Sequence, residues 1–172
     1  EGDFVRALEL GQEVVALCRA RLVAGSGDRR DRQSLAAALQ DTGEMLFQQG
    51  RGDEALAALA EALELSRGLR AEDPDDVEAR HNLVVSLGNA ARAGVVPPVE
   101  ALEEALDEAR ALVALDPARA SSREIAGNAA SQLAQVRLAR GDAQGAHRAA
   151  GAALEAFRAL ARETGAPPHR RG

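Results

Sequence analysis

The amino-acid sequence predicts an all-α protein of about seven helices, stacked as a solenoid. Composition is the first observation. Aromatic residues make up 2% of the 172 residues, with no Trp or Tyr, and the chain has only one Ile and two Thr. Strands favour β-branched and aromatic residues, whereas the abundant Ala, Leu and Arg favour helices. The second observation is a helical hairpin that recurs along the chain, as in repeat proteins.

The best-formed hairpin lies within residues 31–70. Apolar residues recur there at the three- and four-residue spacing of amphipathic helices. Gly50 is expected to end the first helix, and Asp53 to cap the second. The apolar positions are Leu35, Leu39, Leu46 and Phe47 in the first helix, and Ala55, Leu56, Leu59, Ala62, Leu63 and Leu65 in the second.

A single helix over residues 3–24 precedes this hairpin. Gly2 and Asp3 resemble the turn that begins at Gly50, so this helix corresponds to the second half of a hairpin. Its own first helix is absent from the sequence. We therefore expect a chain that begins in mid-repeat, as a fragment of a larger protein.

Two more hairpins follow. The first is expected over 76–115, with Asp76 as a cap and Pro98 at a helix start. The second is expected over 121–164, where Ser121 and Glu124 have the spacing of a capping box. These elements predict one solenoid domain over residues 1–164, followed by a flexible tail over 165–172.

Alanines near the turns define the repeat. They recur at intervals of 48, 46 and 45 residues, at Ala7, Ala55, Ala101 and Ala146. One hairpin cannot bury its apolar face alone, so neighbouring hairpins must stack.

The repeat resembles the tetratricopeptide repeat, which has small residues where its two helices cross and bulky residues between them. In the first full unit the small positions are matched by Gly43, Ala55 and Ala62, and the bulky positions by Leu39, Leu46 and Leu59. The last unit matches with Ala134, Ala146 and Ala153. In the middle unit Gly88 and Ala101 match only with one inserted residue, and Glu108 stands where a small residue belongs.

The resemblance implies a right-handed superhelix whose first helices line a concave face that binds a peptide or protein segment. Repeats of this longer period resemble those of large bacterial signalling and effector proteins. Carried over by position, the candidate peptide-binding residues are Gln40, Glu44, Phe47, Gln48, Asn82, Val85, Asn89, Arg92, Asn128, Ser131, Gln135 and Leu138.

Side-chain amides support this interpretation. Asn82 and Asn89 are seven residues apart, as are Asn128 and Gln135, so each pair lies on one face of its helix. Amides both donate and accept hydrogen bonds, which suits the backbone of an extended peptide. The alternative is that these are ordinary solvated polar residues.

Charge and cysteine content limit the classes of partner and the cellular compartment that we expect. Residues 1–120 hold 23 acidic and 13 basic residues, which disfavours nucleic acid as a partner. The chain has no apolar run long enough to insert into a membrane. One cysteine, Cys18, permits no intrachain disulfide, so we expect a reducing, cytoplasmic location.

No pattern of catalytic or cofactor-binding residues is evident. His81, His147 and His169 fall in different segments without the spacing of a metal site. We therefore predict a protein without enzymatic activity or cofactor. A second hypothesis is structural: the solenoid self-associates or packs on other domains of its own polypeptide, because the unpaired first helix must expose an apolar edge.

Overall fold

The computed structural model describes residues 2–25 and 28–163, and all of its regular elements are helices. No strand occurs in these ranges. The seven helices are α1 (Gly2–Val23), α2 (Arg29–Gln48), α3 (Gly52–Glu72), α4 (Val77–Ala93), α5 (Pro98–Leu115), α6 (Ala120–Ala139) and α7 (Ala143–Glu163). The all-α prediction is confirmed. The predicted tail over 165–172 lies outside the described residues.

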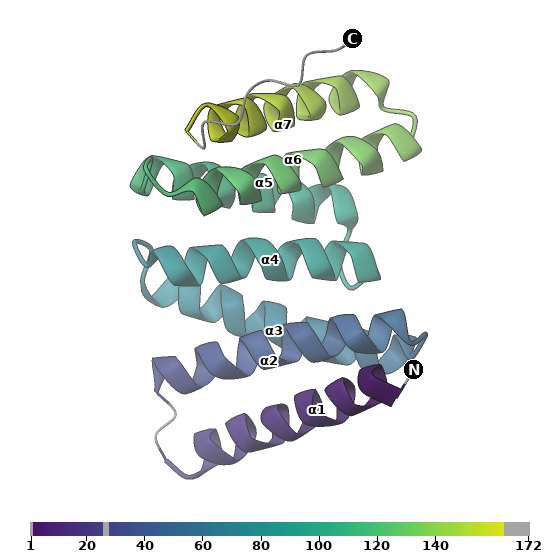
Figure 1. Ribbon diagram of the computed structural model, residues 1–172, viewed down its shortest axis with the longest axis vertical. Coiled ribbons are helices and arrows are strands. Elements are labelled where there is room, and N and C mark those ends of the chain that lie inside the picture. Colours follow the sequence, from purple (N-terminus) through teal and green to yellow (C-terminus); the bar gives the residue numbers. More distant parts are fainter. Residues whose placement is uncertain (1, 26–27, 164–172) are drawn as a thin grey trace.

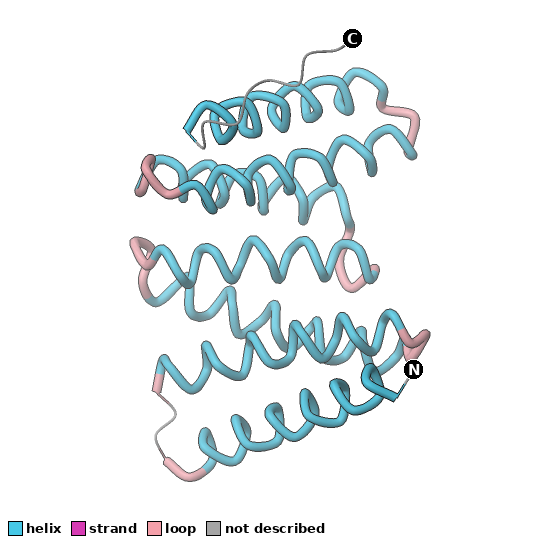
Figure 2. The backbone as a smooth tube through the Cα atoms, in the orientation of Figure 1, coloured by secondary structure: helices cyan, strands magenta, loops and turns pink. Residues whose placement is uncertain are grey.

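The helices form a stack of hairpins (Figures 1 and 2). Each helix packs on the next in sequence, and α4 also contacts both α2 and α6. The first helices of the hairpins, α2, α4 and α6, therefore form one layer. The second helices α3 and α5 lie behind them, with α1 and α7 at the two ends of the stack. None of the described helices is both long and apolar enough to cross a membrane.

Two aspartates fix the starts of α2 and α4. Asp28 accepts a hydrogen bond from Asp31 N at 2.8 Å, and Asp76 accepts from Ala79 N at 3.0 Å. These side chains satisfy backbone donors that a helix start leaves unpaired. Asp76 was expected as a cap from the sequence, whereas Asp28 was not. The expected caps Asp53 and Ser121 differ: α3 begins at Gly52, before Asp53, and α6 begins at Ala120, which places Ser121 inside the helix.

Small residues allow α2 and α3 to cross closely. A Cβ atom on Gly43 would lie 2.8 Å from Leu59 Cγ, closer than packed carbon atoms approach. Ala55 and Ala62 on α3 are also fully buried. The largest apolar cluster extends from Leu63 through α4, α5 and α6 to Ala153, whereas two smaller clusters hold the α1–α3 end.

The middle hairpin differs from the predicted alignment with the first. The capping residues Asp28 and Asp76 are 48 residues apart, so Gly88 corresponds to Gln40 rather than to Gly43. In keeping with this, Gly88 faces Gln132 of α6 and not the partner helix α5. The buried Ala91 takes the position of Gly43. The sequence alignment failed because α4, with 17 residues, is shorter than the 20-residue α2.

Glu108 occupies a position where a small residue was expected, and ion pairs accommodate it. Its carboxylate contacts Arg70 Nε at 3.0 Å and also pairs with Arg80 Nη1. Arg80 is nearly buried, and its second amino group donates to Pro74 O at 2.7 Å. A charge in this location requires such partners, because an unpaired buried charge is costly. The cluster links α3, α4 and α5.

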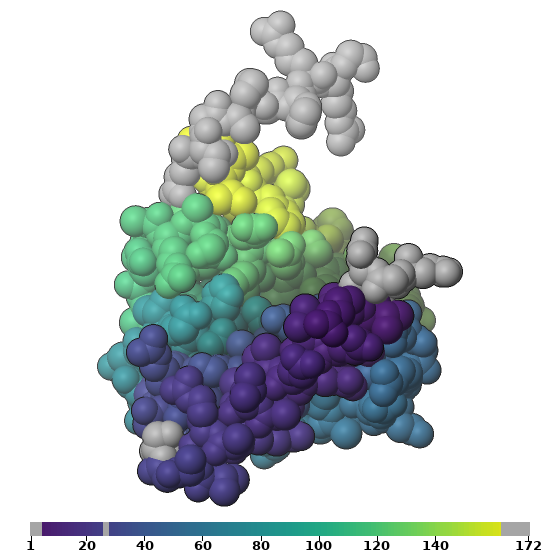
Figure 3. Space-filling view, turned by 60° about the horizontal axis from the view of Figure 1, so that its bottom comes forward, coloured from purple at the N-terminus to yellow at the C-terminus, as the bar shows by residue number. Residues whose placement is uncertain are grey.

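Helix α1 lies across one end of the stack (Figure 3). It carries two apolar faces, and on one of them Leu8 and Val15 are buried against the rest of the protein. Leu10, Val14 and Leu17, which recur every three or four residues, are instead largely exposed. The opposite end of the stack also exposes large apolar residues, namely Leu138, Leu154 and Phe157.

Candidate functional site

The twelve predicted residues lie on the three first helices, four on each of α2, α4 and α6. They are not equally accessible. The spaces between these helices, which we call the α2/α4 interval and the α4/α6 interval, differ in what fills them.

Gln40 is buried in the α2/α4 interval. Its amide nitrogen donates to Ser86 Oγ and, at 3.3 Å, to Asn82 O. Ser86 in turn shares a 2.8 Å hydrogen bond with Ser66 of α3. Gln40 therefore joins α2 to α4 inside the protein, and the structure does not place it on the open face where the sequence had put it.

Arg92 makes the main contacts in the outer part of the same interval. Its guanidinium contacts Glu44 Oε1 at 3.2 Å and lies 5.8 Å from the centroid of the Phe47 ring. It also donates to Asn89 Oδ1 at 3.3 Å, while Gln48 donates to Glu44. The distance from Arg92 to Phe47 is that of a cation–π contact. Five predicted residues thus form one bridge between α2 and α4 on the surface.

A pocket of about 160 Å³ opens in the α4/α6 interval. It brings together three predicted residues, Val85, Asn89 and Asn128. Sequence reasoning missed the other lining residues, which are Val84, Gly88, Leu102, Ala105, Ile125, Ala129 and Gln132. The 48-residue spacing of the helix caps was a signal that could have directed attention to Gly88.

The remaining predicted residues lie around this pocket or away from it. Asn82 is half-buried, and Gln135 is exposed on α6. Ser131 is half-buried. Leu138 follows Gly127 by eleven residues, about three helical turns, on the side of α6 that packs on Phe157 of α7. Leu138 therefore lies toward the end of the stack.

Grooves also occur beside the second helices, and charged pairs cross them. One of about 380 Å³ separates α1 from α3, and an ion pair between Arg19 and Glu61 spans it. Another, of about 360 Å³, separates α5 from α7, and Arg137 pairs with Glu103 there. The α4/α6 pocket differs because no charged residue lines it.

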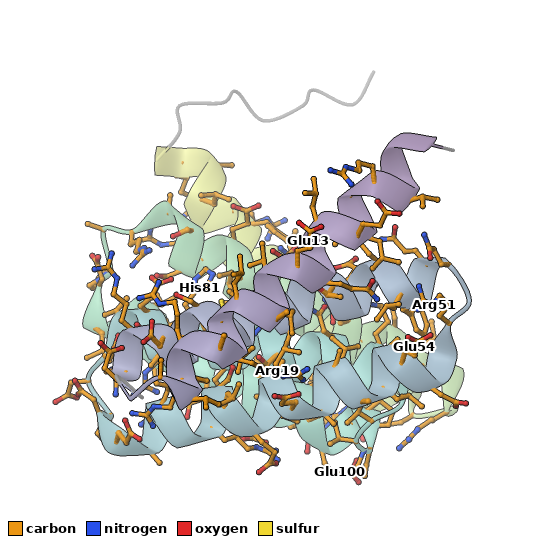
Figure 4. All side chains as sticks on the ribbon, turned by 90° about the horizontal axis from the view of Figure 1, so that it is seen from below. Glu13, Arg19, Arg51, Glu54, His81 and Glu100 are labelled. Carbon is orange, nitrogen blue, oxygen red and sulfur yellow. The ribbon has the colours of Figure 1, made fainter. Side chains whose placement is uncertain are left out.

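Titratable groups do not gather at the pocket. Burial raises the pKa of the Asp41 carboxyl on α2, and the nearby Glu44 carboxylate raises it further. His81 on α4 and Glu100 on α5 lie on opposite sides of the stack (Figure 4). His147 is on α7 and Cys18 is half-buried on α1, while His169 lies outside the described residues. Within the described ranges, no group of three metal-ligating side chains occurs.

No protein-family profile matches this chain, and no curated protein is similar to it. Among solved structures it is similar to the MamA RS-1 ArsTM double mutant, with 16% identity and a TM-score of 0.34. That similarity covers 93% of this chain and 97% of the other.

Proposed function

We propose that this chain is a protein-interaction module that binds an extended peptide or protein segment across α2, α4 and α6. One observation carries the proposal. The layer of first helices presents side-chain amides around an open, uncharged pocket, and the side-chain amides of Asn128 and Gln132 make no hydrogen bond within the described residues. Unpaired amides beside apolar surface suit a peptide, whose backbone needs both donors and acceptors.

The bridge around Arg92 is a second reason to place peptide binding on this face. Glu44, Phe47 and Arg92 present a carboxylate, an aromatic ring and a guanidinium that remain partly exposed. Tetratricopeptide repeats, which the sequence resembles, bind peptides on the corresponding face. Membership of that family, a bacterial origin, a cytoplasmic location and a place in a larger signalling protein are parts of this proposal.

Selection from a random peptide display library tests the proposal. We expect the wild-type protein to enrich peptides, and the double variant Asn89→Ala/Asn128→Ala to bind them at least tenfold more weakly. The matched control is Gln144→Ala, which removes an exposed amide from α7. Circular dichroism must show equal helicity and melting in all three proteins. Equal binding by the double variant would contradict the proposal.

A second candidate function is packing against further protein, either another copy or other domains of the same polypeptide. The exposed apolar face of α1 favours it, since Leu17 is 65% exposed and Leu10 and Val14 are each 46% exposed. Contiguous apolar surface of this kind marks interaction sites. Light scattering over a range of concentrations should show association that Leu10→Gln/Leu17→Gln abolishes. A constant monomer mass would exclude self-association.

A further inference from the structure

The two intervals differ at three equivalent positions, and the change from Gln40 to Gly88 opens the α4/α6 pocket. The helix starts place Gly88 of α4 where Gln40 stands in α2. In the same way, Ala129 and Ile125 of α6 stand where Ser86 and Asn82 stand in α4. Gln40 reaches Ser86 and fills the α2/α4 interval. Gly88 has no side chain to reach Ala129, so the α4/α6 interval stays open.

The walls and floor of the pocket are apolar. Val84 and Val85 come from α4, Leu102 and Ala105 from α5, and Ile125 from α6. A charged group placed there would lose its hydration without gaining a partner. The pocket therefore favours an uncharged, apolar group.

The rim of the pocket carries three amides. Asn89, Asn128 and Gln132 come from the facing sides of α4 and α6. The Oδ1 atom of Asn89 accepts from Arg92, which leaves its amide nitrogen as a donor. Asn128 and Gln132 are exposed. The rim can thus donate to and accept from the peptide groups on either side of an inserted side chain.

The volume limits the size of the inserted group. A cavity of about 150 Å³ can hold a benzene molecule, which has six heavy atoms. The side chains of Leu, Ile and Met have four heavy atoms each and fit the 160 Å³ pocket. A methyl group would leave most of the apolar wall uncovered.

We propose that the α4/α6 pocket is a specificity pocket that takes one Leu, Ile or Met side chain from a bound segment, with the rim amides holding the flanking peptide groups. This inference rests on the proposed function, and it adds the chemical class of the residue that anchors the partner. Because the α2/α4 interval is filled and the α4/α6 interval is open, the anchoring residue must lie over the α4/α6 interval.

Ile125 offers a direct test, because it is the only isoleucine of the chain. Selective ¹³C labelling of the isoleucine δ1 methyl group gives one signal, from a residue that lines the pocket. The probe is N-acetyl-leucine methylamide, a neutral aliphatic residue between two peptide groups. We expect a saturable shift of the Ile125 methyl signal. N-acetyl-alanine methylamide should bind more than tenfold more weakly, since three fewer carbons are buried. The charged aspartate analogue should cause no shift.

Gly88→Gln tests the cause of the opening, with Ala37→Gln as its matched control on the exposed side of α2. Gly88→Gln should abolish the leucine-dependent shift, and Ala37→Gln should preserve it. Gly88→Ala, which perturbs the fold less, should weaken binding to an intermediate degree. An Ile125 signal that does not respond up to the solubility limit of the probe would overturn the inference, as would equal responses to the alanine probe.

The two proposals can fail separately. If library peptides bind and need Asn89 and Asn128, but leave the Ile125 signal unchanged, the pocket inference is wrong and the proposed function stands. If the leucine probe binds but no peptide is enriched, the proposed function is wrong. The pocket is then a site for a small neutral aliphatic molecule.

Discussion

The α2/α4 and α4/α6 intervals join equivalent helices in one layer, yet one is filled by a polar network and the other is open. Gln40, Ser86 and Ser66 connect three helices in the first interval. Gly88, Ala129 and Ile125 leave a pocket in the second. The repeat fixes the path of the backbone, while a few side chains at equivalent positions decide whether the space between neighbours is structural or accessible.

Replacing Gln40 by Gly should make the filled interval resemble the open one. It removes the buried hydrogen bonds to Ser86 and Asn82 and adds the cost of a helical glycine. We expect the free energy of unfolding to fall by about 2–4 kcal/mol. Ala37→Gly, on the exposed side of α2, should cost only about 1 kcal/mol. Urea denaturation measures both, and equal losses would show that the network does not hold α2 to α4.

Two helical glycines should respond to alanine with opposite signs. A Cβ atom on Gly88 would meet only Gln132 Oε1, at 3.3 Å, at the end of an exposed side chain. Gly88→Ala should therefore raise stability by up to about 1 kcal/mol through helix propensity. Gly43→Ala should lower it by about 1–3 kcal/mol, because its Cβ would overlap Leu59. Thermal melts of the two variants compare them directly, and shifts of the same sign would contradict the packing described here.

Lowering the pH should weaken the contact between α2 and α4 at Asp76. Burial opposes ionisation of Asp76, but hydrogen bonds from Ala79 N–H, the Arg29 guanidinium and Glu78 N–H outweigh it and lower the pKa. The stabilisation is therefore present above the unfolded-state value of 3.8 and is lost as the pH falls below it. At the α4/α6 interval the equivalent position, just before α6, is held by Arg119 and not by an aspartate.

Asp76→Asn keeps the capping oxygen and removes the charge. It should cost about 0.5–1 kcal/mol at pH 7, the scale of a partly screened ion pair, and progressively less as the pH falls below 3.8. Guanidine is a salt and would screen the pair, so urea is the denaturant of choice. Asp75→Asn at the exposed neighbouring position is the control. A loss that does not depend on pH would assign the effect to the cap alone.

The fold could be predicted from the sequence because helix propensity, apolar spacing and turn glycines all indicated the same structure. The candidate site could be predicted only in part. The face was chosen by position in the repeat, which brought Val85, Asn89 and Asn128 to the pocket. Gln40 was wrongly placed on the open face because its position along α2 does not show whether it is exposed or buried. That depends on how closely the neighbouring helix α4 packs.

Gly88 was missed for a different reason. A glycine between two helices can serve close packing or leave space, and the choice depends on which helix faces it. The one-residue insertion assumed in the connector turned Gly88 toward α5, whereas the shorter α4 turns it toward α6. Ile125 and Gln132 carried no signal of their own, since both are ordinary positions of an amphipathic helix.

Helix α1 is terminal and contacts only α2 and α3 among the described elements, and Leu8 and Val15 are the only buried large apolar side chains among its described ones. In a linear array each unit is stabilised by its immediate neighbours, so a terminal helix with neighbours on one side only opens first. Amide hydrogens of α1 should consequently exchange with solvent through local fraying, at rates that denaturant barely changes. Those of α4 and α5, inside the largest apolar cluster, should exchange only when most of the stack unfolds.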